Sequence, residues 1–369
     1  MPPRPRTSRP SKPKENRGES PAASASDPEF AVHIHEIDKI FEAAGLTRNR
    51  SKKPAGVVRR ARLHDKTPDE LRPAPAIVTV AQNGVEWVAV PAWKKFSWLW
   101  HGFSTRRTGL SRAYAPDGAP GDLNLGFTAS DDRANVLRNR ELLSEAITGD
   151  ARAPLVTLKQ IHSSVIHIAG PDAAGTVCKG DGMMTNRPGM LLGVQTADCT
   201  PVLVADSKRK VVAAFHSGWR GTAKRIVESG IGRMRLEFGS RPEDLIAAIG
   251  PGIGPCCYEV GEDVLSEFES QFSYARELFH EVYDTDPVRT KYPMLFLTQR
   301  APGHSNLGPS MHLDVAEANR RQLIAAGIAP RAIKMVGGCT SCQPKLFFSY
   351  RGSRGHCGRM LSVIGIRPD

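Results

Sequence analysis

Two apolar segments of this sequence each end beside a side chain that can bind a metal ion or act as a nucleophile. Cys199 lies just before the run PVLVA, and His216 lies just after the run VVAAF. A third residue of this kind, His162, follows the apolar segment LVTLKQI. One thiol and two imidazoles are the donor set of a catalytic zinc site, in which three protein ligands leave a fourth position open for water or substrate.

These three residues are far apart in the sequence, so the pattern alone leaves other interpretations open. Taken singly, His162 could be a hydrogen-bonded structural histidine, and Cys199 could be an inert buried thiol. Neighbouring residues favour a functional site. Asp198 could orient a metal ligand or act as a general base, and Arg220, in a loop before a predicted helix, could hold a phosphate or carboxylate group.

The elements that would position these residues are strands and helices that alternate after residue 76. Short apolar strands are predicted within 153–170, 189–196, 201–206, 211–216 and 245–250, and helices over 131–147, 222–238 and 313–327. Asp131 is the expected N-cap of the first of these helices. Continuous apolar strands between helices are typical of an α/β fold whose sheet is covered on both faces. In such sheets ligands gather beyond the carboxyl ends of strands, where all three metal-binding residues are expected.

Composition restricts the class of protein. The chain has 369 residues, a net charge of +12 and seven irregularly spaced cysteines. That length fits one large α/β domain plus an extension, and the cysteines do not form the dense framework of a small secreted domain. No apolar segment reaches the roughly 18 residues that span a bilayer, and no secretory signal follows the basic N-terminus. We therefore expect a soluble, cytoplasmic protein with reduced cysteines.

The N-terminal region supplies much of the positive charge. Its opening, MPPRPRTSRPSKPKENR, places the cations among prolines and serines. We predict that residues 1–76 are a basic, largely disordered extension with one possible short helix over 30–46, and that residues 77–369 form the catalytic domain. The tail could contact nucleic acid weakly and non-specifically. A dedicated nucleic-acid-binding function is not expected, because no aromatic platform or known binding module accompanies the tail.

A second group of cysteines lies near the C-terminus. Cys339 and Cys342 have the Cys-x-x-Cys spacing of half a structural zinc site or of a redox pair. The adjacent Cys256 and Cys257 would have to complete such a zinc site, and their spacing is a poor match to it. The segment around them, GPGIGPCCYEVG, lacks the Lys-Ser/Thr of a phosphate-binding P-loop. We interpret it as a turn that lines the pocket, with Cys257 as a substrate-binding residue.

Several motifs occur in the order typical of one family. They are HGFSTRRTG, DLNLGF, KQIH, GDGMMTN, TADCTPVLVAD, FHSGWRGT, GPGIGPCCYEVG, LDVAEANRRQL and CTSCQPKLFFSYR followed by GRM. Each is weak alone, but in this order the set is specific. The chain resembles the laccase-domain or polyphenol oxidoreductase family, the YfiH-type proteins. The resemblance runs from about Trp87 to Ile366 and leaves residues 1–76 without a counterpart.

The resemblance implies a fold, a metal and a reaction. The fold would be a layered α/β sandwich with a mixed sheet, and the positions that match the family's zinc ligands are His162, Cys199 and His216. The implied activity is that of a zinc-dependent purine nucleoside phosphorylase. Adenosine, inosine, guanosine or methylthioadenosine would react with phosphate to give the base and ribose 1-phosphate. Hydrolytic conversion of adenosine to inosine would share the site.

Other residues receive expected roles in this reaction. We expect Arg106 and Arg220 to bind phosphate, Lys159 and Gln160 to line the substrate pocket, and Asp198 to move a proton during deamination. The transition state is cationic at the sugar and anionic at the base. A positioned phosphate and a proton donor to the base would therefore both lower the barrier.

Two other enzymatic interpretations stay open. The family's older name suggests a copper-dependent polyphenol oxidoreductase, but a multicopper site needs many imidazoles, and His-x-His occurs only at His33 and His35. A metal-free hydrolase acting on cell-wall precursors would use Cys199 as the nucleophile and His216 as the base, which leaves His162 without a role. Phosphate dependence distinguishes the phosphorylase from both, and metal content distinguishes it from the hydrolase.

Overall fold

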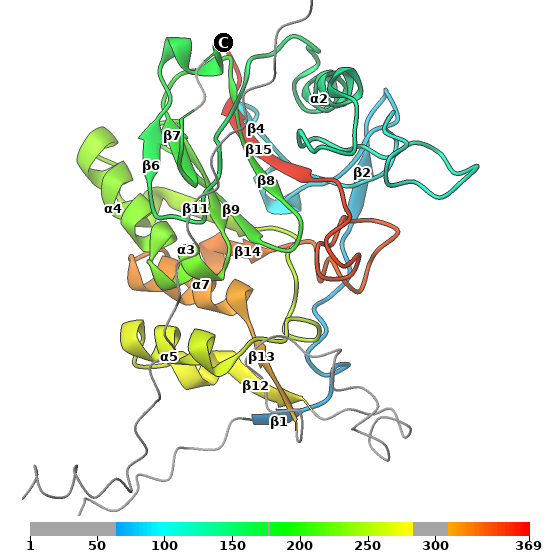
Figure 1. The fold of residues 1–369 in the computed structure, drawn as a ribbon. Helices are drawn as coiled ribbons and strands as arrows, with labels where there is room; N and C mark the ends of the chain where they lie inside the picture. Colours follow the sequence, from blue (N-terminus) through cyan, green and yellow to red (C-terminus); the bar gives the residue numbers. More distant parts are fainter. Residues whose placement is uncertain (1–63, 176–177, 283–308) are drawn as a thin grey trace, which may run out of the picture. The chain divides into compact units, whose positions relative to one another are not determined.

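Two six-stranded sheets packed against each other form the centre of this protein (Figure 1). The computed structural model describes residues 64–175, 178–282 and 309–369. The first sheet has the strand order β2-β3-β4-β15-β8-β5. Its strands are β2 (Val78–Val80), β3 (Glu86–Val88), β4 (Leu99–Ser104), β15 (Met360–Ile366), β8 (Leu191–Thr196) and β5 (Leu155–Thr157).

The second sheet has the strand order β14-β11-β9-β10-β7-β6. Both sheets are mixed, because β5 pairs with β8, β6 with β7 and β11 with β14 in parallel, while their other pairs are antiparallel. The strands of the second sheet are β14 (Ile333–Met335), β11 (Leu245–Ile249), β9 (Thr200–Asp206), β10 (Val211–Ser217), β7 (Gly182–Thr185) and β6 (Ile166–Ile168).

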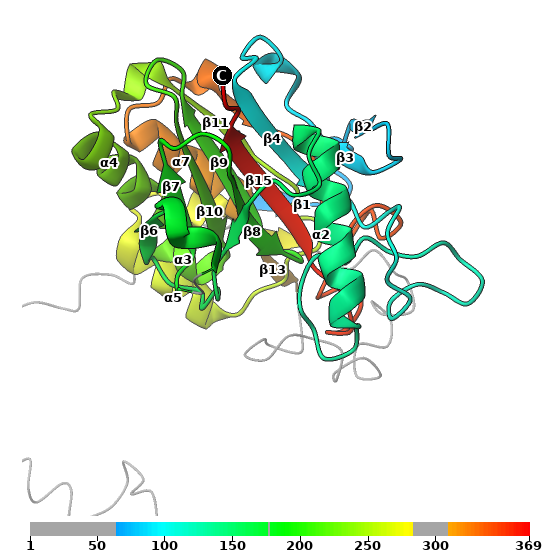
Figure 2. The ribbon, with the colours of Figure 1, turned by 90° about the horizontal axis from the view of Figure 1, so that it is seen from above.

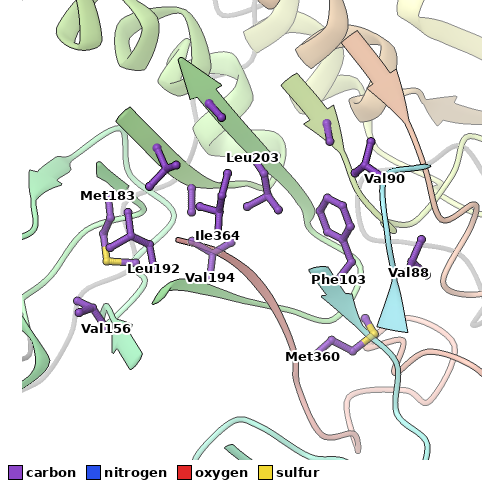
Figure 3. Close-up of a cluster of buried hydrophobic side chains, with 14 of the residues drawn as sticks. Val88, Val90, Phe103, Val156, Met183, Leu192, Val194, Leu203, Met360 and Ile364 are labelled. Carbon is purple, nitrogen blue, oxygen red and sulfur yellow. The ribbon is translucent and has the colours of Figure 1, made fainter. Parts of the chain in front are cut away.

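Helices cover the outer faces of the two sheets (Figure 2). Helix α2 (Arg133–Thr148) packs on the first sheet, and α4 (Ile226–Phe238) and α7 (Val315–Ala325) pack on the second. The run from Pro201 to Ala205 in β9 is apolar because both faces of this strand are buried: Val202 and Val204 face the helices, whereas Leu203 faces the other sheet. Figure 3 shows Leu203 in the inner core with Val194 and Ile364 of the opposite sheet. The predicted layered α/β sandwich with mixed sheets is confirmed.

A small third sheet includes residues that the sequence assigns to the extension. Its order is β1-β12-β13, and it lies beside helix α5 (Glu262–Gln271). The strands are β1 (His64–Lys66), β12 (Phe279–Val282) and β13 (Ser310–Leu313). The fold therefore includes residues 64–76, because β1 pairs with β12 and Leu71 is buried. Residues 1–63, with the expected helix over 30–46, lie outside the described residues.

Two predicted helices differ from the observed ones in detail. The N-cap of α2 is Asp132, whose carboxylate accepts a hydrogen bond from the backbone N–H of Ala134. Asp131 instead accepts hydrogen bonds from the side chains of Ser111 and Asn124. The predicted helix over 222–238 is divided into α3 (Trp219–Ala223) and α4 by Arg225, whose φ is 56°. No helix in the described ranges is long and apolar enough to cross a membrane.

Candidate metal centre and active site

His162, Cys199 and His216 meet at one end of the sandwich. Their ligand atoms all lie within 4.8 Å of one another, and the Cys199 Sγ is 3.9 Å from the His162 Nε2. Antiparallel pairing of β9 with β10 places His216 opposite Pro201, so its imidazole lies next to the turn that carries Cys199. His162 reaches the same point from the loop between β5 and β6, with a φ of 56°.

A buried carboxylate that sequence analysis did not single out holds two of these elements together. The Asp181 side chain is inaccessible to solvent, and its Oδ1 is 2.8 Å from the His216 Nδ1. The same oxygen accepts the backbone N–H of His162 at 3.0 Å, while Oδ2 accepts the N–H and hydroxyl of Ser163 at 2.6 Å. Asp181 thus orients one imidazole directly and fixes the loop that carries the other. Its only sequence signal is its place in the motif GDGMMTN.

The electrostatics of the metal-free site produce an ion pair. Burial would raise the pKa of the Cys199 thiol, but the charge of His216 and hydrogen bonds from His162 and His216 lower it to about 6. Burial would lower the pKa of His216, but Cys199 and Asp181 raise it to about 9. The Asp181 carboxyl is also buried, yet hydrogen bonds from His216 and Ser163 hold its pKa well below the usual range. Near neutral pH the pair is therefore a thiolate and an imidazolium.

The donor set and its surroundings fit a single metal ion. Two imidazole nitrogens and one thiolate are ligands that zinc and copper accept. His216 is 3% exposed and anchored by Asp181, whereas the His162 side chain is exposed, which leaves one side of the site accessible. Gly218 is required for this packing, because a Cβ at this position would lie 2.8 Å from the Cys199 Sγ.

Cationic and aromatic side chains lie near the candidate metal centre. The exposed Arg220 guanidinium stacks on Trp219 at 4.3 Å and forms no hydrogen bond or ion pair with the described residues. Arg351 stacks over Tyr258 at 5.4 Å. Burial raises the pKa of the Tyr258 phenol, and the negative charge of Cys199 acts in the same direction. Tyr258 and Arg351 are therefore additional candidate site residues, and sequence analysis assigned neither of them a definite role.

Asp198 connects the turn before Cys199 to two other loops. Its Oδ1 accepts the hydroxyl of Thr340 at 2.7 Å, and its Oδ2 accepts the backbone N–H of Arg351 at 2.7 Å. Its backbone carbonyl accepts the N–H of Ile253 at 2.8 Å, and its φ is 87°. The carboxylate that contacts a candidate metal ligand is that of Asp181, whose Oδ1 lies 2.8 Å from the His216 Nδ1.

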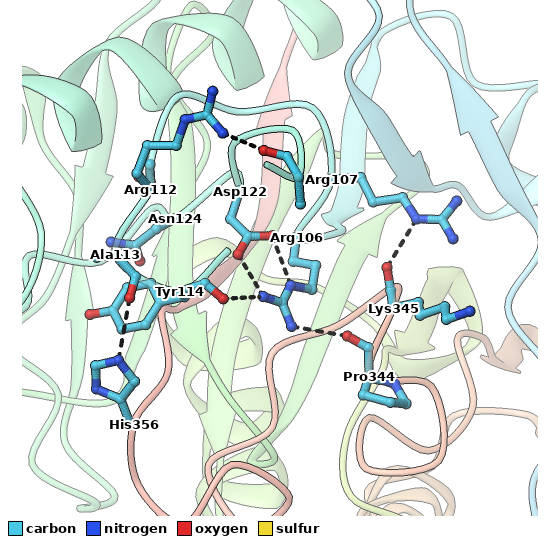
Figure 4. A network of polar contacts seen from close by, with 12 residues as sticks. Arg106, Arg107, Arg112, Ala113, Tyr114, Asp122, Asn124, Pro344, Lys345 and His356 are labelled. Carbon is cyan, nitrogen blue, oxygen red and sulfur yellow. Dashed lines mark hydrogen bonds and ion pairs between the residues drawn. The ribbon is translucent and has the colours of Figure 1, made fainter. Parts of the chain in front are cut away.

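Arg106 belongs to a polar network that fixes a loop (Figure 4). Its Nε donates to Asp122 at 2.8 Å, and its other nitrogens donate to Asp122 and to the carbonyls of Tyr114 and Pro344. The guanidinium also stacks on Phe348 at 4.6 Å. Because all three of its nitrogens donate to protein acceptors, the arrangement favours a structural role over the expected phosphate-binding one.

The three residues expected to line the substrate pocket, Lys159, Gln160 and Cys257, have different surroundings. The amide of Gln160 exchanges two 2.7 Å hydrogen bonds with the backbone of Gln195, so it fixes its loop to the end of β8. The side chain of Lys159 is exposed, and its backbone N–H donates to the carbonyl of Cys178. The thiol of Cys257 lies in a separate group of cysteines, 3.4 Å from the Cys342 Sγ.

Comparison with known proteins places this geometry in a family. The family model described as multi-copper polyphenol oxidoreductase laccase matches residues 100–367. The chain is 36% identical to a purine nucleoside phosphorylase of Deinococcus radiodurans over 267 residues, which are 72% of this chain and 88% of that protein. It is 29% identical to adenosine deaminase RL5 of an unknown prokaryotic organism, over 71% of this chain and 92% of that protein.

A solved structure supports the same conclusion. The crystal structure of YlmD from Geobacillus stearothermophilus matches with a TM-score of 0.63 and 30% identity, covering 80% of this chain and 100% of that one. The fold, the ordered motifs and the family match agree over the same region. This chain therefore belongs to the multi-copper polyphenol oxidoreductase laccase family.

Proposed function

We propose that this protein is a zinc-dependent purine nucleoside phosphorylase that also deaminates adenosine. The observation that supports the proposal is the convergence of His162, Cys199 and His216, whose ligand atoms lie within 4.8 Å of one another. The names of relatives similar over most of the chain, purine nucleoside phosphorylase and adenosine deaminase, favour the same reactions.

The proposed metal is one zinc ion held by His162, Cys199 and His216. When bound, zinc would polarise an oxygen of phosphate, water or the nucleoside. Asp181 accepts the Nδ1 proton of His216 at 2.8 Å, so the lone pair that would bind the metal is that of Nε2, once its proton is released. The accessible side at His162 provides the position for an exogenous ligand.

Phosphate would bind near Arg220 and Arg351. A guanidinium can donate two parallel hydrogen bonds to a phosphate group, and Arg220 has its donors free of protein partners among the described residues. Asp198 would position Arg351 by accepting its backbone N–H. We assign Asp198 this positioning role because its carboxylate is only partly available for proton transfer, since the residue is 8% exposed and accepts two hydrogen bonds.

In the phosphorolysis we propose, a phosphate oxygen forms a bond to the anomeric carbon as the bond to the purine nitrogen breaks. The electron pair of that bond leaves with the base, which then takes up a proton. The Tyr258 phenol is the proposed proton donor, because burial keeps it protonated and no protein acceptor is found for it among the described residues. In deamination, water adds to the purine carbon that bears the amino group, and ammonia leaves.

A metal-free hydrolase that uses Cys199 and His216 is the second candidate function. It is favoured by one observation, the placement of the Cys199 thiol within 4.8 Å of an imidazole nitrogen of His216, where the pKa of Cys199 is about 6 and that of His216 about 9. Such a pair is the activated form of a cysteine nucleophile. Copper chemistry receives less support, because the described residues contain one group of candidate ligands with histidine, and that group has two imidazoles.

The test is product analysis of the purified full chain with adenosine, in phosphate buffer and in phosphate-free buffer. We expect adenine and ribose 1-phosphate only with phosphate, and inosine in both buffers. Cys199→Ala should abolish all products. Cys178→Ser, at a cysteine outside both cysteine-containing groups, is the matched control and should retain them. Absence of every product from zinc-loaded protein would overturn the nucleoside assignment and favour the hydrolase.

A further inference from the structure

We propose that Cys256, Cys257, Cys339 and Cys342 bind a second metal ion, a structural zinc, separate from the site at Cys199. The four sulfur atoms all lie within 4.8 Å of one another. This inference does not depend on the proposed nucleoside chemistry, since it concerns other residues and another kind of site.

The fold explains why cysteines so distant in sequence meet. Strands β11 and β14 are parallel neighbours in the second sheet, so the loops that follow them leave the same edge side by side. The first loop contains Cys256 and Cys257, and the second contains Cys339 and Cys342. A bridge between Gly252 and Cys339 continues the parallel pairing beyond the strands and aligns the loops. Whether the four sulfurs meet therefore depends more on the register of β11 and β14 than on the sequence spacing of Cys256 and Cys257.

The distances fit four ligands on one ion. Zinc–sulfur bonds of about 2.3 Å in a tetrahedral site place the sulfurs about 3.8 Å apart. The Cys342 Sγ lies 3.5 Å from that of Cys256 and 3.4 Å from that of Cys257. A disulfide would require about 2.0 Å, so these sulfurs are not bonded to each other. In an iron–sulfur cluster the four cysteines are divided among two or four irons, so sulfurs on different irons lie further apart than sulfurs on one shared ion.

The surroundings supply the hydrogen bonds that thiolates require. The backbone N–H of Gly254 donates to the Cys339 Sγ at 3.2 Å, and the backbone of Cys342 provides another hydrogen bond to the same sulfur. A Cβ on Gly254 would lie 3.3 Å from the Cβ of Cys339, so glycine allows this close approach. The guanidinium of Arg72 lies beside Cys342 and offsets negative charge there. Cys256 and Cys339 are buried at 6% and 1% exposure.

The proposed zinc would connect loops that also contact the active site. Ile253 donates its backbone N–H to the carbonyl of Asp198 at 2.8 Å, and Thr340 donates its hydroxyl to the Asp198 carboxylate at 2.7 Å. Each residue lies within three positions of a cysteine of this group. The second ion would thus stabilise the turn that presents Cys199, while taking no direct part in the reaction.

Metal content of the full chain tests the proposal. We expect two zinc ions per chain in the unmodified protein, one in Cys199→Ala and one in the double variant Cys339→Ser, Cys342→Ser. Cys178→Ser should retain two. Cobalt substitution of Cys199→Ala, which leaves the four-cysteine group intact, should give the sulfur-to-cobalt charge-transfer and strong d–d absorption of a tetrahedral tetrathiolate. The cobalt spectrum keeps the test decisive if the double variant fails to fold.

Three results would overturn the proposal. The first is one zinc in the unmodified protein and none in Cys199→Ala, with the four cysteines reacting as free thiols in the native state. The second is a disulfide among these cysteines in the protein purified without reductant, detected by mass spectrometry. The third is iron in place of zinc at one equivalent per chain. Because metal content and cobalt absorption do not require turnover, loss of nucleoside activity leaves this test unaffected.

Discussion

The Nδ1 of His216 lies 2.8 Å from the Oδ1 of Asp181, in a pair that solvent barely reaches. The same carboxylate accepts three hydrogen bonds from the loop of His162 and a fourth, weaker one at 3.3 Å from Ile161. One side chain therefore sets both the tautomer of one imidazole and the position of the other.

Replacing Asp181 with asparagine should weaken the metal centre. Asparagine has one accepting oxygen in place of two, so its NH2 group would face the donors on one side of the present carboxylate, either His216 Nδ1–H and His162 N–H or the N–H and hydroxyl of Ser163. We expect zinc affinity at the His162–Cys199–His216 site to fall by about 10- to 100-fold, the usual effect of losing such an orienting partner. A competition titration with a chromogenic chelator measures this.

The control for that variant is Asp206→Asn. Asp206 is also buried, and its carboxylate accepts hydrogen bonds from the backbone N–H groups of Lys208 and Arg209. It lies at the end of β9 opposite to Cys199. Its substitution should leave zinc affinity unchanged. Equal losses of zinc affinity in the two variants would show that Asp181 affects the site only through the stability of the fold.

Gly218→Ala should also disrupt the site, but by a steric route. The new Cβ would lie 2.8 Å from the Cys199 Sγ, a contact that forces the thiol to move. We expect a large loss of bound zinc with little change in the circular dichroism spectrum. Gly232→Ala in α4 is the matched control, because no atom lies within 4 Å of its Cβ position. That control should keep its zinc and gain about 0.5–1 kcal/mol of stability, and unchanged zinc in Gly218→Ala would refute the predicted packing.

Zinc affinity at this site should rise with pH. Protons compete with the metal for the Cys199 thiolate and the His216 imidazole, whose pKa values in the metal-free protein are about 6 and about 9. Between these values Cys199 is already deprotonated and His216 is not, so binding should release about one proton. The affinity should therefore increase about tenfold per pH unit and level off above about pH 9.

Calorimetry in buffers of different ionisation enthalpy measures that proton release. The difference between the unmodified protein and Cys199→Ala isolates this site from any other zinc-binding group. A release that stays near zero between pH 7 and pH 8 would contradict the thiolate–imidazolium pair.

Arg220→Ala should raise the KM for phosphate while zinc content stays constant. A hydrogen bond to a charged group contributes about 1.5–3 kcal/mol, so we expect a rise of about 10- to 100-fold. Steady-state kinetics with phosphate varied at saturating nucleoside give this value.

Arg106→Ala should instead destabilise the fold by about 3–5 kcal/mol, because it leaves the Asp122 carboxylate buried and unpaired. A phosphate KM that rises in Arg106→Ala and not in Arg220→Ala would show that Arg106, and not Arg220, binds phosphate.

Sequence analysis reached the three candidate metal ligands because each lies beside its own apolar strand, and such strands are visible as local patterns. Asp181 was missed because it meets His216 across the pairing of β7 with β10, 35 residues along the chain. Sequence analysis named Cys256 and Cys257 as the pair that would complete a site with Cys339 and Cys342, but their adjacent spacing counted against it. Their meeting depends on β11 and β14 being parallel neighbours, a long-range relationship that no local spacing encodes. The start of the fold was placed too late because β1 is short and its partner β12 is more than 200 residues away in sequence.

The most direct test of the central claim is a zinc titration of metal-free protein, with adenine formation from adenosine and phosphate measured at each point. We predict that activity rises in proportion to zinc bound at the His162–Cys199–His216 site and that Cys199→Ala stays inactive at every point. Full adenine formation before any zinc is added, or formation that does not require phosphate, would contradict the claim.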